Sequence, residues 1–338
     1  MNSKKSMIND RKNNYIREGK GTVSQEADHI YVAFSADERY VQHAAVAMAS
    51  ILDHTAEPSR LHFFLFFETL SEQAKARVSA TVRDYGAVID FCPIESDGEA
   101  SYYVSGQLSK ATYFRLQIPK LLPNKVGRVL YLDCDLLVYA DIAELWAQDM
   151  KGKAVAAVPD FGIMASHREW GNKQRNLGFA AGDLYFNAGV LLMDVDAWRM
   201  HHYSARVAEL AAKNTYRHHD QDALNVVFHR NWTPLPLRWN VIPPVWQLFL
   251  KVLLRKRFRI PAIQARTHIA VLHYAGGYKP WEYKPYDGFN DEYYRLLEKT
   301  AFCDVPMPQF DARRKGRSIQ RQLFWIRMAD WKTRIFSS

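Results

Sequence analysis

Short apolar runs alternate with longer segments of mixed apolar and polar residues along most of the chain. A short run bounded by polar residues is typical of a buried strand, whereas apolar positions three or four residues apart are typical of a helix that packs on a sheet. Alternating strands and helices predict an α/β fold with a doubly wound, mostly parallel sheet. We expect strands at His29–Phe34, Leu61–Phe67, Ala87–Pro93, Arg128–Leu132, Ala154–Val158 and Ala188–Asp194, and helices at Tyr40–Asp53, Ser71–Tyr85 and Ala197 to about Lys213.

The same pattern divides the chain into three parts. Residues 1–27 are polar without sustained periodicity, which predicts a flexible arm. Residues 28–300 carry the strand and helix pattern of one folded domain, and residues 301–338 form a basic, aromatic, helical tail. Within the domain, Phe161–Leu184 has few periodic apolar positions and four glycines, so we expect a long functional loop there, such as a lid or an acceptor-binding element.

The composition is that of an ordinary globular protein, with 338 residues, 48% of them hydrophobic and 24% charged. The three cysteines are far apart, which indicates neither a disulfide framework nor a zinc site and fits a reducing compartment. No apolar stretch approaches the roughly 18 residues of a membrane span, and the N-terminus lacks the apolar segment of a signal peptide. We therefore expect a cytoplasmic protein.

The net charge of +9 comes from the two ends of the chain. Residues 1–27 hold six Lys and Arg against three Asp and Glu, and residues 311–338 hold eight against two. The body between them has 31 residues of each sign. Because a nucleic-acid enzyme would carry its basic surface around the active site, this distribution argues against a nucleic-acid partner and indicates that the ends are attachment segments.

An acidic motif, Asp133-Cys134-Asp135, directly follows the apolar run Arg128–Leu132. In an extended segment, side chains at i and i+2 point to the same side, so the two carboxylates can converge on one cation while Cys134 points away. Hard oxygen ligands at the carboxyl end of a strand suit Mg²⁺ or Mn²⁺, and such an ion typically carries the phosphates of a substrate. The motif therefore predicts a nucleotide-diphosphate site. The alternative is a pair of solvated aspartates in a turn.

Polar residues also flank two other expected strands. Asp37 follows a small-residue turn, where it could accept hydrogen bonds from a base or ribose or could simply cap the next helix. No Gly-x-Gly-x-x-Gly lies near it, which argues against a dinucleotide dehydrogenase. Asn187 and Gly189 stand at the start of a later strand, where an amide could bind sugar hydroxyls and a glycine could let a ligand approach. A β-bulge is the alternative.

Two polar clusters follow in the second half of the chain. Asp220, Gln221 and Asp222 stand at the start of a helical pattern, where Asp220 could be no more than a helix cap. His273 follows an apolar run and precedes Lys279 by six residues. A histidine in this place could complete a metal site, and the lysine could neutralise charge on a leaving phosphate. A lone histidine is more often structural, so both readings stay open.

Taken in order, these motifs resemble the family-8 retaining glycosyltransferases, most nearly the bacterial lipopolysaccharide core glucosyl- and galactosyltransferases. The resemblance runs from about His29 to Tyr283 and rests on Phe34-Ser-Ala-Asp37, Ala111-Thr-Tyr-Phe-Arg115-Leu, Asp133-Cys-Asp135, Asp160, Phe186-Asn187-Ala-Gly189, Asp220-Gln221-Asp222 and His273-Tyr…Gly276…Lys279-Pro-Trp281. It implies a fold of the GT-A type in residues 28–300, with UDP-glucose or UDP-galactose as donor and Mn²⁺ or Mg²⁺ as cofactor. It also implies a lipopolysaccharide core oligosaccharide or a related glycan as acceptor.

The resemblance further implies a role for each of these residues. The metal would be held by Asp133, Asp135 and His273. The uridine, ribose or phosphate of the donor would be held by Phe34, Ser35, Asp37, Tyr40 and Arg115. The transferred sugar would be surrounded by Asn187, Asp220, Gln221 and Asp222, and Gly189 would also bind the substrate. The departing diphosphate would be held by Gly276 and Lys279. The catalytic residues would be Gln221, Asp222, Asp160 and Lys279.

Retention of configuration could arise by two routes, a covalent double displacement or a same-face attack by the acceptor hydroxyl. The resemblance places Gln221 nearest the position of a nucleophile. An amide is a poor nucleophile, and carboxylates are the usual choice in covalent glycosyl transfer. We therefore favour same-face attack.

The tail contains an amphipathic pattern. Apolar residues recur at helical spacing at Phe324, Met328, Trp331 and Ile335, with basic residues roughly opposite. Such a pattern suits a helix that lies on an anionic lipid surface. We therefore expect residues 311–338 to hold the protein on the cytoplasmic face of the inner membrane. A helix docked on the body or on a partner is the alternative.

Two other classes of protein fit parts of the sequence. A phosphatase of the haloacid dehalogenase type also uses Asp-x-Asp after an apolar strand, but it usually holds its metal with further acids downstream, often an Asp-Asp pair, and this chain has no such pair. A basic membrane adaptor without catalysis would not need Asp133, Asp135, His273 and Lys279 together. Another cell-surface glycan or a glycoprotein is the alternative acceptor for a glycosyltransferase.

Overall fold

The structure is a computed structural model that describes residues 29–95, 111–246, 256–276, 279–282 and 288–306. The predictions of a flexible arm at 1–27 and of a membrane-associating helix at 311–338 lie outside the described residues. All of the residues proposed for the site are described.

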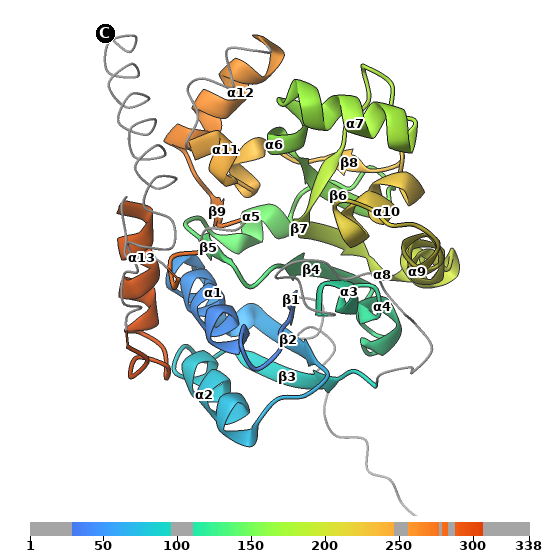
Figure 1. The fold of residues 1–338 in the computed structure, drawn as a ribbon. Coiled ribbons are helices and arrows are strands. Elements are labelled where there is room, and N and C mark those ends of the chain that lie inside the picture. Colours follow the sequence, from blue (N-terminus) through green and yellow to red (C-terminus); the bar gives the residue numbers. More distant parts are fainter. Residues whose placement is uncertain (1–28, 96–110, 247–255, 277–278, 283–287, 307–338) are drawn as a thin grey trace, which may run out of the picture.

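A seven-stranded sheet forms the centre of the molecule (Figure 1). Its four parallel pairings and two antiparallel pairings confirm the mostly parallel sheet that the sequence predicts. Both antiparallel pairings are made by one central strand, which begins at Phe186 and pairs with a neighbour on each side. The strands follow the order β3 (Val88–Pro93), β2 (Leu61–Phe67), β1 (Ile30–Ser35), β4 (Arg128–Leu132), β7 (Phe186–Asp194), β6 (Val155–Pro159) and β8 (Thr233–Pro234).

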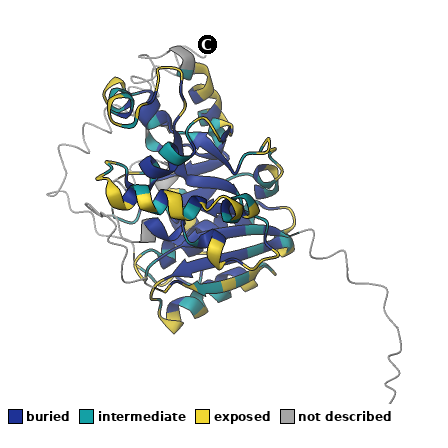
Figure 2. Ribbon diagram, turned by 90° about the vertical axis from the view of Figure 1, so that its right-hand side faces the viewer, coloured by how far each residue is buried: buried dark blue, intermediate teal, exposed yellow. Residues whose placement is uncertain are grey.

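Helices cover both faces of this sheet, as a doubly wound fold requires, and the strands between them are largely buried (Figure 2). One face carries α1 (Val41–His54), α2 (Glu72–Arg83), α5 (Ile142–Trp146) and α13 (Gly288–Leu297). The other face carries α3 (Ala111–Phe114), α4 (Ile118–Leu121), α8 (Val195–Met200), α9 (Tyr203–Lys213) and α10 (His219–Val227).

A smaller group of elements lies on the side of the molecule where β6 and β8 lie, at the top of Figure 1. It contains α6 (Phe161–Met164), α7 (His167–Leu177), α11 (Pro243–Trp246) and α12 (Lys256–Thr267). Two short 3₁₀ helices, η2 (Pro58–Arg60) and η3 (Leu237–Trp239), connect other elements. The strands β5 (Leu136–Val138) and β9 (Val271–His273) form a separate antiparallel pair. Because β5 follows the acidic motif directly, this pair brings a late part of the chain to that motif.

The prediction of a long loop at Phe161–Leu184 is wrong. Most of the segment is helical, in α6 and α7. Ser166 caps α7 by accepting a hydrogen bond from the Glu169 backbone at 3.3 Å, and Gly178 ends it with a φ of 73°. Within α7 only Trp170 and Lys173 are buried, so its apolar stripe is too narrow to show as a helical period in the sequence.

The prediction of a single helix from Ala197 to about Lys213 is also wrong, because the segment is not one continuous helix. It is two helices, α8 and α9, separated at His201 and His202. His202 has a φ of 53°, which lies in the left-handed region and breaks the helical path. The break turns Tyr203 towards the core, where it packs on Trp198 with ring centroids 6.0 Å apart.

Candidate active site

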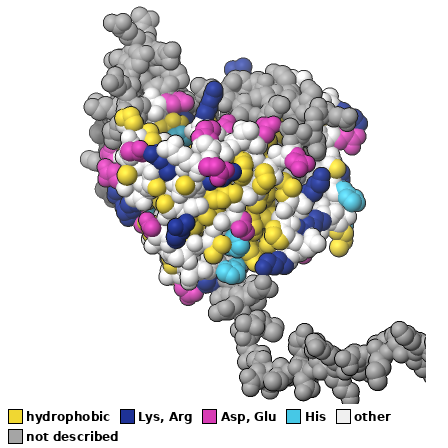
Figure 3. Space-filling view, turned by 90° about the horizontal axis from the view of Figure 1, so that it is seen from below, with side chains coloured by type: hydrophobic (Ala, Val, Ile, Leu, Met, Phe, Trp, Pro, Cys, Tyr) yellow, Lys and Arg dark blue, Asp and Glu magenta, His cyan; other side chains and the backbone are white. Residues whose placement is uncertain are grey.

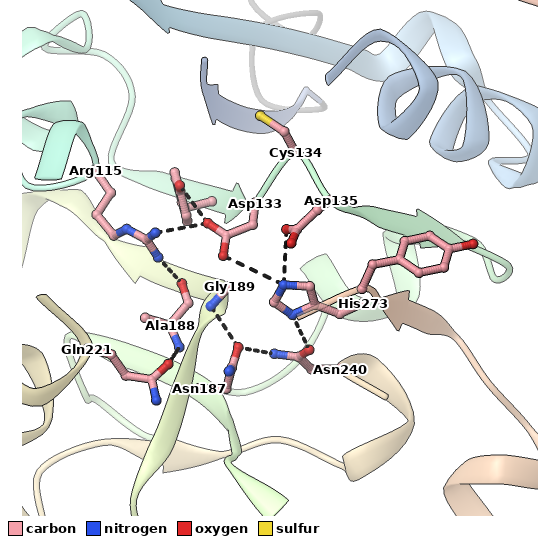
Figure 4. Close-up of polar contacts among 12 residues, drawn as sticks. Arg115, Asp133, Cys134, Asp135, Asn187, Ala188, Gly189, Gln221, Asn240 and His273 are labelled. Atoms are coloured by element: carbon pink, nitrogen blue, oxygen red, sulfur yellow. Dashed lines mark hydrogen bonds and ion pairs between the residues drawn. The ribbon is translucent and has the colours of Figure 1, made fainter. Parts of the chain in front are cut away.

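The acidic motif lies directly after the carboxyl end of β4 (Figure 4). The backbone N–H of Asp133 donates to the carbonyl of Gly189 on β7 at 2.9 Å, which fixes the motif against its neighbouring strand. The Cys134 side chain points away and its thiol donates to the carbonyl of Ser35 at 3.2 Å. Burial raises the pKa of this thiol well above its ordinary value, so it stays protonated. The alternation expected across an extended segment is therefore present.

His273 reaches the motif through strand pairing. It lies opposite Leu136 in the β5–β9 ladder, and the next backbone N–H, that of Tyr274, donates to the carbonyl of Asp135 at 2.8 Å. This register places the His273 imidazole Nε2 3.1 Å from Asp135 Oδ1 and 3.8 Å from Asp133 Oδ2. The pairing brings together residues 138 positions apart in the chain.

The three side chains form a donor set that fits a divalent cation. Asp133, Asp135 and His273 each offer one ligand atom, and these atoms lie within 4.8 Å of one another. Two carboxylate oxygens and one imidazole nitrogen suit Mn²⁺ or Mg²⁺. Gly189 keeps the space open, because a Cβ at this position would overlap the His273 ring and lie 2.8 Å from Asp133 Oδ2. The solvated-turn alternative for the motif is wrong, since Asp135 is only 12% exposed.

Arg115 lies buried between two acids. Its guanidinium donates to Asp133 at 3.0 Å and is 2.9 Å from Asp220, and it stacks over the Tyr131 ring at 4.6 Å. Burial opposes its charge, but Asp133 and Asp220 outweigh burial and raise the pKa of Arg115 above its ordinary value. Burial raises the pKa of Asp220 to about 6, although Arg115 counteracts it. Arg115 is thus a fixed cation that balances the acids of the site.

Lys279 supplies a second cation next to the motif. Its ammonium donates to Asp135 and to the Tyr274 carbonyl, the latter at 2.8 Å. Burial by itself would raise the pKa of Asp135, but Lys279 and His273 outweigh it and hold that pKa well below the ordinary value. Asp135 therefore carries its negative charge at neutral pH. Gly276, with a φ of 98°, lies three residues earlier at the pocket.

On the opposite wall, three predicted residues form one hydrogen-bonded network. Asp160 Oδ2 accepts from the amide of Gln221 at 3.0 Å and from the amide of Asn187 at 3.1 Å. The other oxygen of Asp160 caps α6 by accepting from the Ile163 backbone at 2.9 Å. Gln221 Oε1 accepts from the Ala188 backbone at 3.0 Å. The network holds these side chains rigidly at the pocket.

The alternatives that the sequence left open are resolved here. The register between β6 and β7 shifts so that Val158 pairs with Asn187 while Ala157 pairs with Leu191. The strand pairing is therefore irregular at this point, as a β-bulge would make it, and the same stretch lines the pocket with Asn187 and Gly189. The cap alternative for Asp220 is not what forms, because α10 begins at His219 and Asp220 lies in its first turn beside Arg115.

Asp222 is not brought to the pocket. One of its oxygens accepts from the Tyr185 hydroxyl at 2.6 Å and pairs with Lys173, and the other accepts from the His218 backbone at 3.0 Å. The residue is 2% exposed. This side chain cross-links α7, β7 and α10, whereas the resemblance implied a place beside the sugar and in catalysis.

Four residues near the end of β1 were predicted to hold the donor. Ser35, Asp37 and Tyr40 line the pocket, whereas the Phe34 side chain is fully buried in the core beneath it. Asp37 Oδ1 accepts from the backbone N–H of Arg39 and of Tyr40, both at 3.0 Å, in the turn that precedes α1. Their contacts with a nucleoside stay predictions.

The pocket has a volume of about 750 Å³, within the range of small-molecule sites. The predicted residues that line it are Ser35, Asp37, Tyr40, Arg115, Asp133, Asp135, Asp160, Asn187, Gly189, Asp220, Gln221, His273, Gly276 and Lys279. These residues come from distant parts of the chain and converge on one cavity of a size that fits a nucleotide sugar.

Several residues that support the site could not be predicted from the sequence. Asn240, Lys173 and Tyr185 are buried and bond to predicted site residues, Asn240 to His273 and the other two to Asp222. Asn240 stands alone between Trp239 and Val241. A single polar residue in an apolar run is as typical of a turn as of a site, so only the fold distinguishes them.

The fold and the pocket define a glycosyltransferase with a GT-A fold. The chain belongs to glycosyl transferase family 8, whose sequence model matches residues 31–284. It is similar to general stress protein A of Bacillus subtilis, with 27% identity over 288 residues that cover 82% of this chain and 96% of that protein. It is also similar to lipopolysaccharide 1,3-galactosyltransferase of Salmonella typhimurium, with 28% identity over 264 residues that cover 76% of this chain and 74% of that protein.

Solved structures give the same result. The structure of galactosyltransferase LgtC in complex with donor and acceptor sugar analogues superposes with a TM-score of 0.70 and 28% sequence identity, covering 82% of this chain and 98% of that chain. The resemblance to family 8 that the motifs indicated is confirmed. Within the described part of the chain, no helix is long and apolar enough to cross a membrane.

Proposed function

We propose that this protein transfers glucose or galactose from a UDP-sugar to a hydroxyl group of a lipopolysaccharide core oligosaccharide, with retention and an α-linkage. The observation that carries the proposal is the cluster of Asp133, Asp135 and His273 beside Lys279 in the pocket. Family membership and the similarity to the Salmonella typhimurium galactosyltransferase support the substrate class. Another cell-surface glycan or a glycoprotein is the alternative acceptor.

Asp133, Asp135 and His273 would hold Mn²⁺ or Mg²⁺. When bound, such an ion acts as a Lewis acid that offsets the negative charge of a departing diphosphate. Lys279 adds a fixed ammonium beside Asp135, so the leaving group would meet positive charge that is already in place. Fixed charge of this kind stabilises the transition state without reorganisation during the reaction.

The carboxylates opposite the metal cluster support same-face attack. Double displacement needs a carboxylate that is free to attack the anomeric carbon. Both oxygens of Asp160 accept hydrogen bonds within the protein, and Asp222 is buried away from the pocket. Gln221 is held in the pocket wall by Asp160 and the Ala188 backbone. In same-face attack these groups position the sugar, and the diphosphate takes the proton of the acceptor hydroxyl.

The first test is release of UDP from UDP-glucose and UDP-galactose with Mn²⁺, with Mg²⁺ and with EDTA. We expect slow release of UDP that falls at least about 100-fold in EDTA, since the charge on the departing diphosphate is then uncompensated. Release of inorganic phosphate from a phosphate ester would instead indicate a phosphatase, and no metal-dependent turnover would indicate a binding protein.

The acceptor is tested separately with truncated lipopolysaccharides. Transfer of labelled sugar to one truncated core, with none to the intact core, would support the proposed acceptor. Transfer only to protein or to other glycans would leave the enzyme class intact and replace the acceptor. Trapping with a slow fluorinated donor decides the mechanism, because a covalent adduct on Asp160 or Asp222 would overturn same-face attack.

A further inference from the structure

A chain of buried hydrogen bonds runs from the backbone of β7 to the far side of His273 (Figure 4). The Gly189 N–H is 2.9 Å from Asn187 Oδ1, Asn187 Oδ1 is 2.9 Å from Asn240 Nδ2, and Asn240 Oδ1 is 2.9 Å from His273 Nδ1. Asn187, Asn240 and His273 are 8%, 1% and 3% exposed. The chain therefore lies behind the metal cluster, on the side of the imidazole that faces away from the two carboxylates.

The direction of this chain is fixed at its start. A backbone N–H can only donate, so the atom of Asn187 that meets Gly189 is its carbonyl oxygen. The other end of the same amide faces the Asp160 carboxylate at 3.1 Å, which can only accept when ionised and so independently requires the NH₂ group there. Asn187 Oδ1 must then receive an N–H from Asn240, which turns the oxygen of Asn240 towards His273.

An imidazole nitrogen that meets a carbonyl oxygen must carry a hydrogen. Nδ1 of His273 therefore carries a hydrogen whether or not a cation is bound. Nε2, which lies 3.1 Å from Asp135 Oδ1, is the nitrogen that faces the carboxylates, and it would give its lone pair to a cation bound between them. The other tautomer would place two lone pairs against each other at Nδ1 and a hydrogen between the ring and the two carboxylates. The hydrogen bond on one imidazole nitrogen thus decides which nitrogen can ligate.

We propose that Asn240 is a positioning residue that holds His273 in the Nδ1–H tautomer and orients Nε2 towards Asp133 and Asp135. The inference rests on the metal site proposed above. The backbone around Asn240 suits this role, because Val241 donates to Val271 at 2.8 Å and accepts from His273 at 3.0 Å. Asn240 is therefore attached directly to β9, the strand that carries His273.

Binding of Mn²⁺ alone to the full chain, without donor, tests the proposal by isothermal titration calorimetry. Asn240→Leu keeps the approximate volume but removes the acceptor, and we expect Mn²⁺ affinity to fall about 10- to 100-fold, the usual cost of losing a partner of a ligating histidine. Asn240→Asp keeps an oxygen acceptor for Nδ1–H but loses the N–H that Asn240 donates to Asn187. We expect it to lower thermal stability and to retain Mn²⁺ affinity within several-fold of the wild type. Equal loss in both variants, or no loss in Asn240→Leu, would overturn the proposal.

Asn225→Ala is the matched control. Asn225 is a buried asparagine whose hydrogen bonds within the described part of the chain go to backbone atoms of Phe186 and Gln221, and none of these bonds involves Asp133, Asp135 or His273. Its loss should lower thermal stability without changing Mn²⁺ affinity. If the wild type itself bound no Mn²⁺, the proposed metal site would fail. If the wild type bound Mn²⁺ and Asn240→Leu bound it equally well, the positioning role alone would fail.

Nitrogen NMR of the ¹⁵N-histidine-labelled, Mg²⁺-loaded protein reads the tautomer directly. The His273 signals are assigned by their loss in His273→Gln. We expect Nδ1 to be the protonated nitrogen in the wild type and in Asn240→Asp, and a mixture of tautomers in Asn240→Leu. Protonation at Nε2 in the wild type would contradict the proposal regardless of any effect on stability.

Discussion

Gly189 shows how one residue without a side chain keeps space for the proposed metal site. A Cβ there would overlap the His273 ring and approach Asp133 Oδ2 to 2.8 Å. Both neighbours belong to packed elements, since Asp133 is tied to β7 through its backbone and His273 to β5 through β9. Neither can move aside without disturbing a strand pairing.

Gly189→Ala should therefore separate the three proposed ligands. We expect Mn²⁺ affinity and metal-dependent UDP release to fall at least about 10-fold, as for other disturbances of a metal site. Gly182→Ala is the control, because a Cβ at Gly182 meets nothing within 4 Å. Calorimetry and a UDP-release assay measure both variants. Normal Mn²⁺ binding by Gly189→Ala would contradict the proposed site.

The buried side chain of His43 makes the free energy of unfolding depend on pH. Its ring stacks on Trp281 with centroids 3.5 Å apart, and its Nδ1 lies 2.6 Å from the Tyr293 hydroxyl. Burial lowers the pKa of His43 from 6.5 to about 3. Between these values the unfolded chain binds a proton that the folded protein does not, so the free energy of unfolding decreases as the pH falls below 6.5.

Replacement of His43 by Phe should remove this contribution while keeping the aromatic stack. Between pH 7 and pH 5 we expect the wild type to lose roughly 2 kcal/mol of unfolding free energy more than His43→Phe does. Urea denaturation of both proteins at the two pH values measures the difference. An identical pH dependence in the two proteins would show that folding does not lower the pKa of His43.

At the scale of secondary-structure elements, a buried ion pair and a tyrosine hydroxyl link α7, α10 and the residue that precedes β7. Lys173 of α7 pairs with Asp222 of α10, and the Tyr185 hydroxyl, just before β7, donates to Asp222 at 2.6 Å. The Lys173 and Asp222 side chains are 4% and 3% exposed. Burial lowers the pKa of Lys173, although Asp222 opposes it. The contacts describe a structural cross-link behind the pocket wall.

We therefore expect Asp222→Asn to lower the stability of the fold and not to affect the reaction directly. Removing one partner of a buried pair leaves an uncompensated charge, which costs about 3–5 kcal/mol of unfolding free energy. The double variant Lys173→Met/Asp222→Asn should recover much of that loss, because both charges are gone. A double-mutant cycle by urea denaturation measures the coupling. A stable Asp222→Asn protein that has lost all UDP release would instead support the catalytic role expected from the resemblance.

At the scale of the whole molecule, the net positive charge comes from the ends of the chain and not from the body between them. The body between residues 27 and 311 has 31 residues of each sign, and basic and acidic side chains are interspersed on the face seen in Figure 3. Residues 311–338 contribute eight basic residues against two acidic ones. The C-terminal end of the described chain is anchored before that tail, where Phe302 is 5% exposed and the Ala301 N–H donates to Thr81 at 3.0 Å.

Deletion of residues 311–338 should therefore leave the folded body intact and remove membrane binding. We expect UDP release from the UDP-sugar to stay within about twofold, and flotation with anionic vesicles to be lost, because each basic residue near an anionic surface adds about 1 kcal/mol. Neutral vesicles and high salt are the controls. Unchanged binding to anionic vesicles would exclude the tail as the attachment segment, and lowered thermal stability would indicate a tail docked on the body.

The sequence by itself determined what depends on neighbours in the chain. The apolar runs predicted the strands of the main sheet from β1 to β7, and the alternation of an extended segment predicted that Asp133 and Asp135 share a side while Cys134 does not. The order of the motifs was enough to indicate family 8. Local preference failed where the apolar stripe was narrow, as in α7, and where one residue in the left-handed region divided α8 from α9.

Only the tertiary structure decided which side chains meet. His273 joins the acidic motif because β9 pairs with β5 in one register, and Asn240 reaches His273 because its neighbour Val241 bonds to that strand. Asp220 and Asp222 are two residues apart, yet one faces Arg115 at the pocket and the other is buried against Lys173. The physical reason is that the position of a side chain is set by long-range strand pairing and packing, which no local pattern in the sequence specifies.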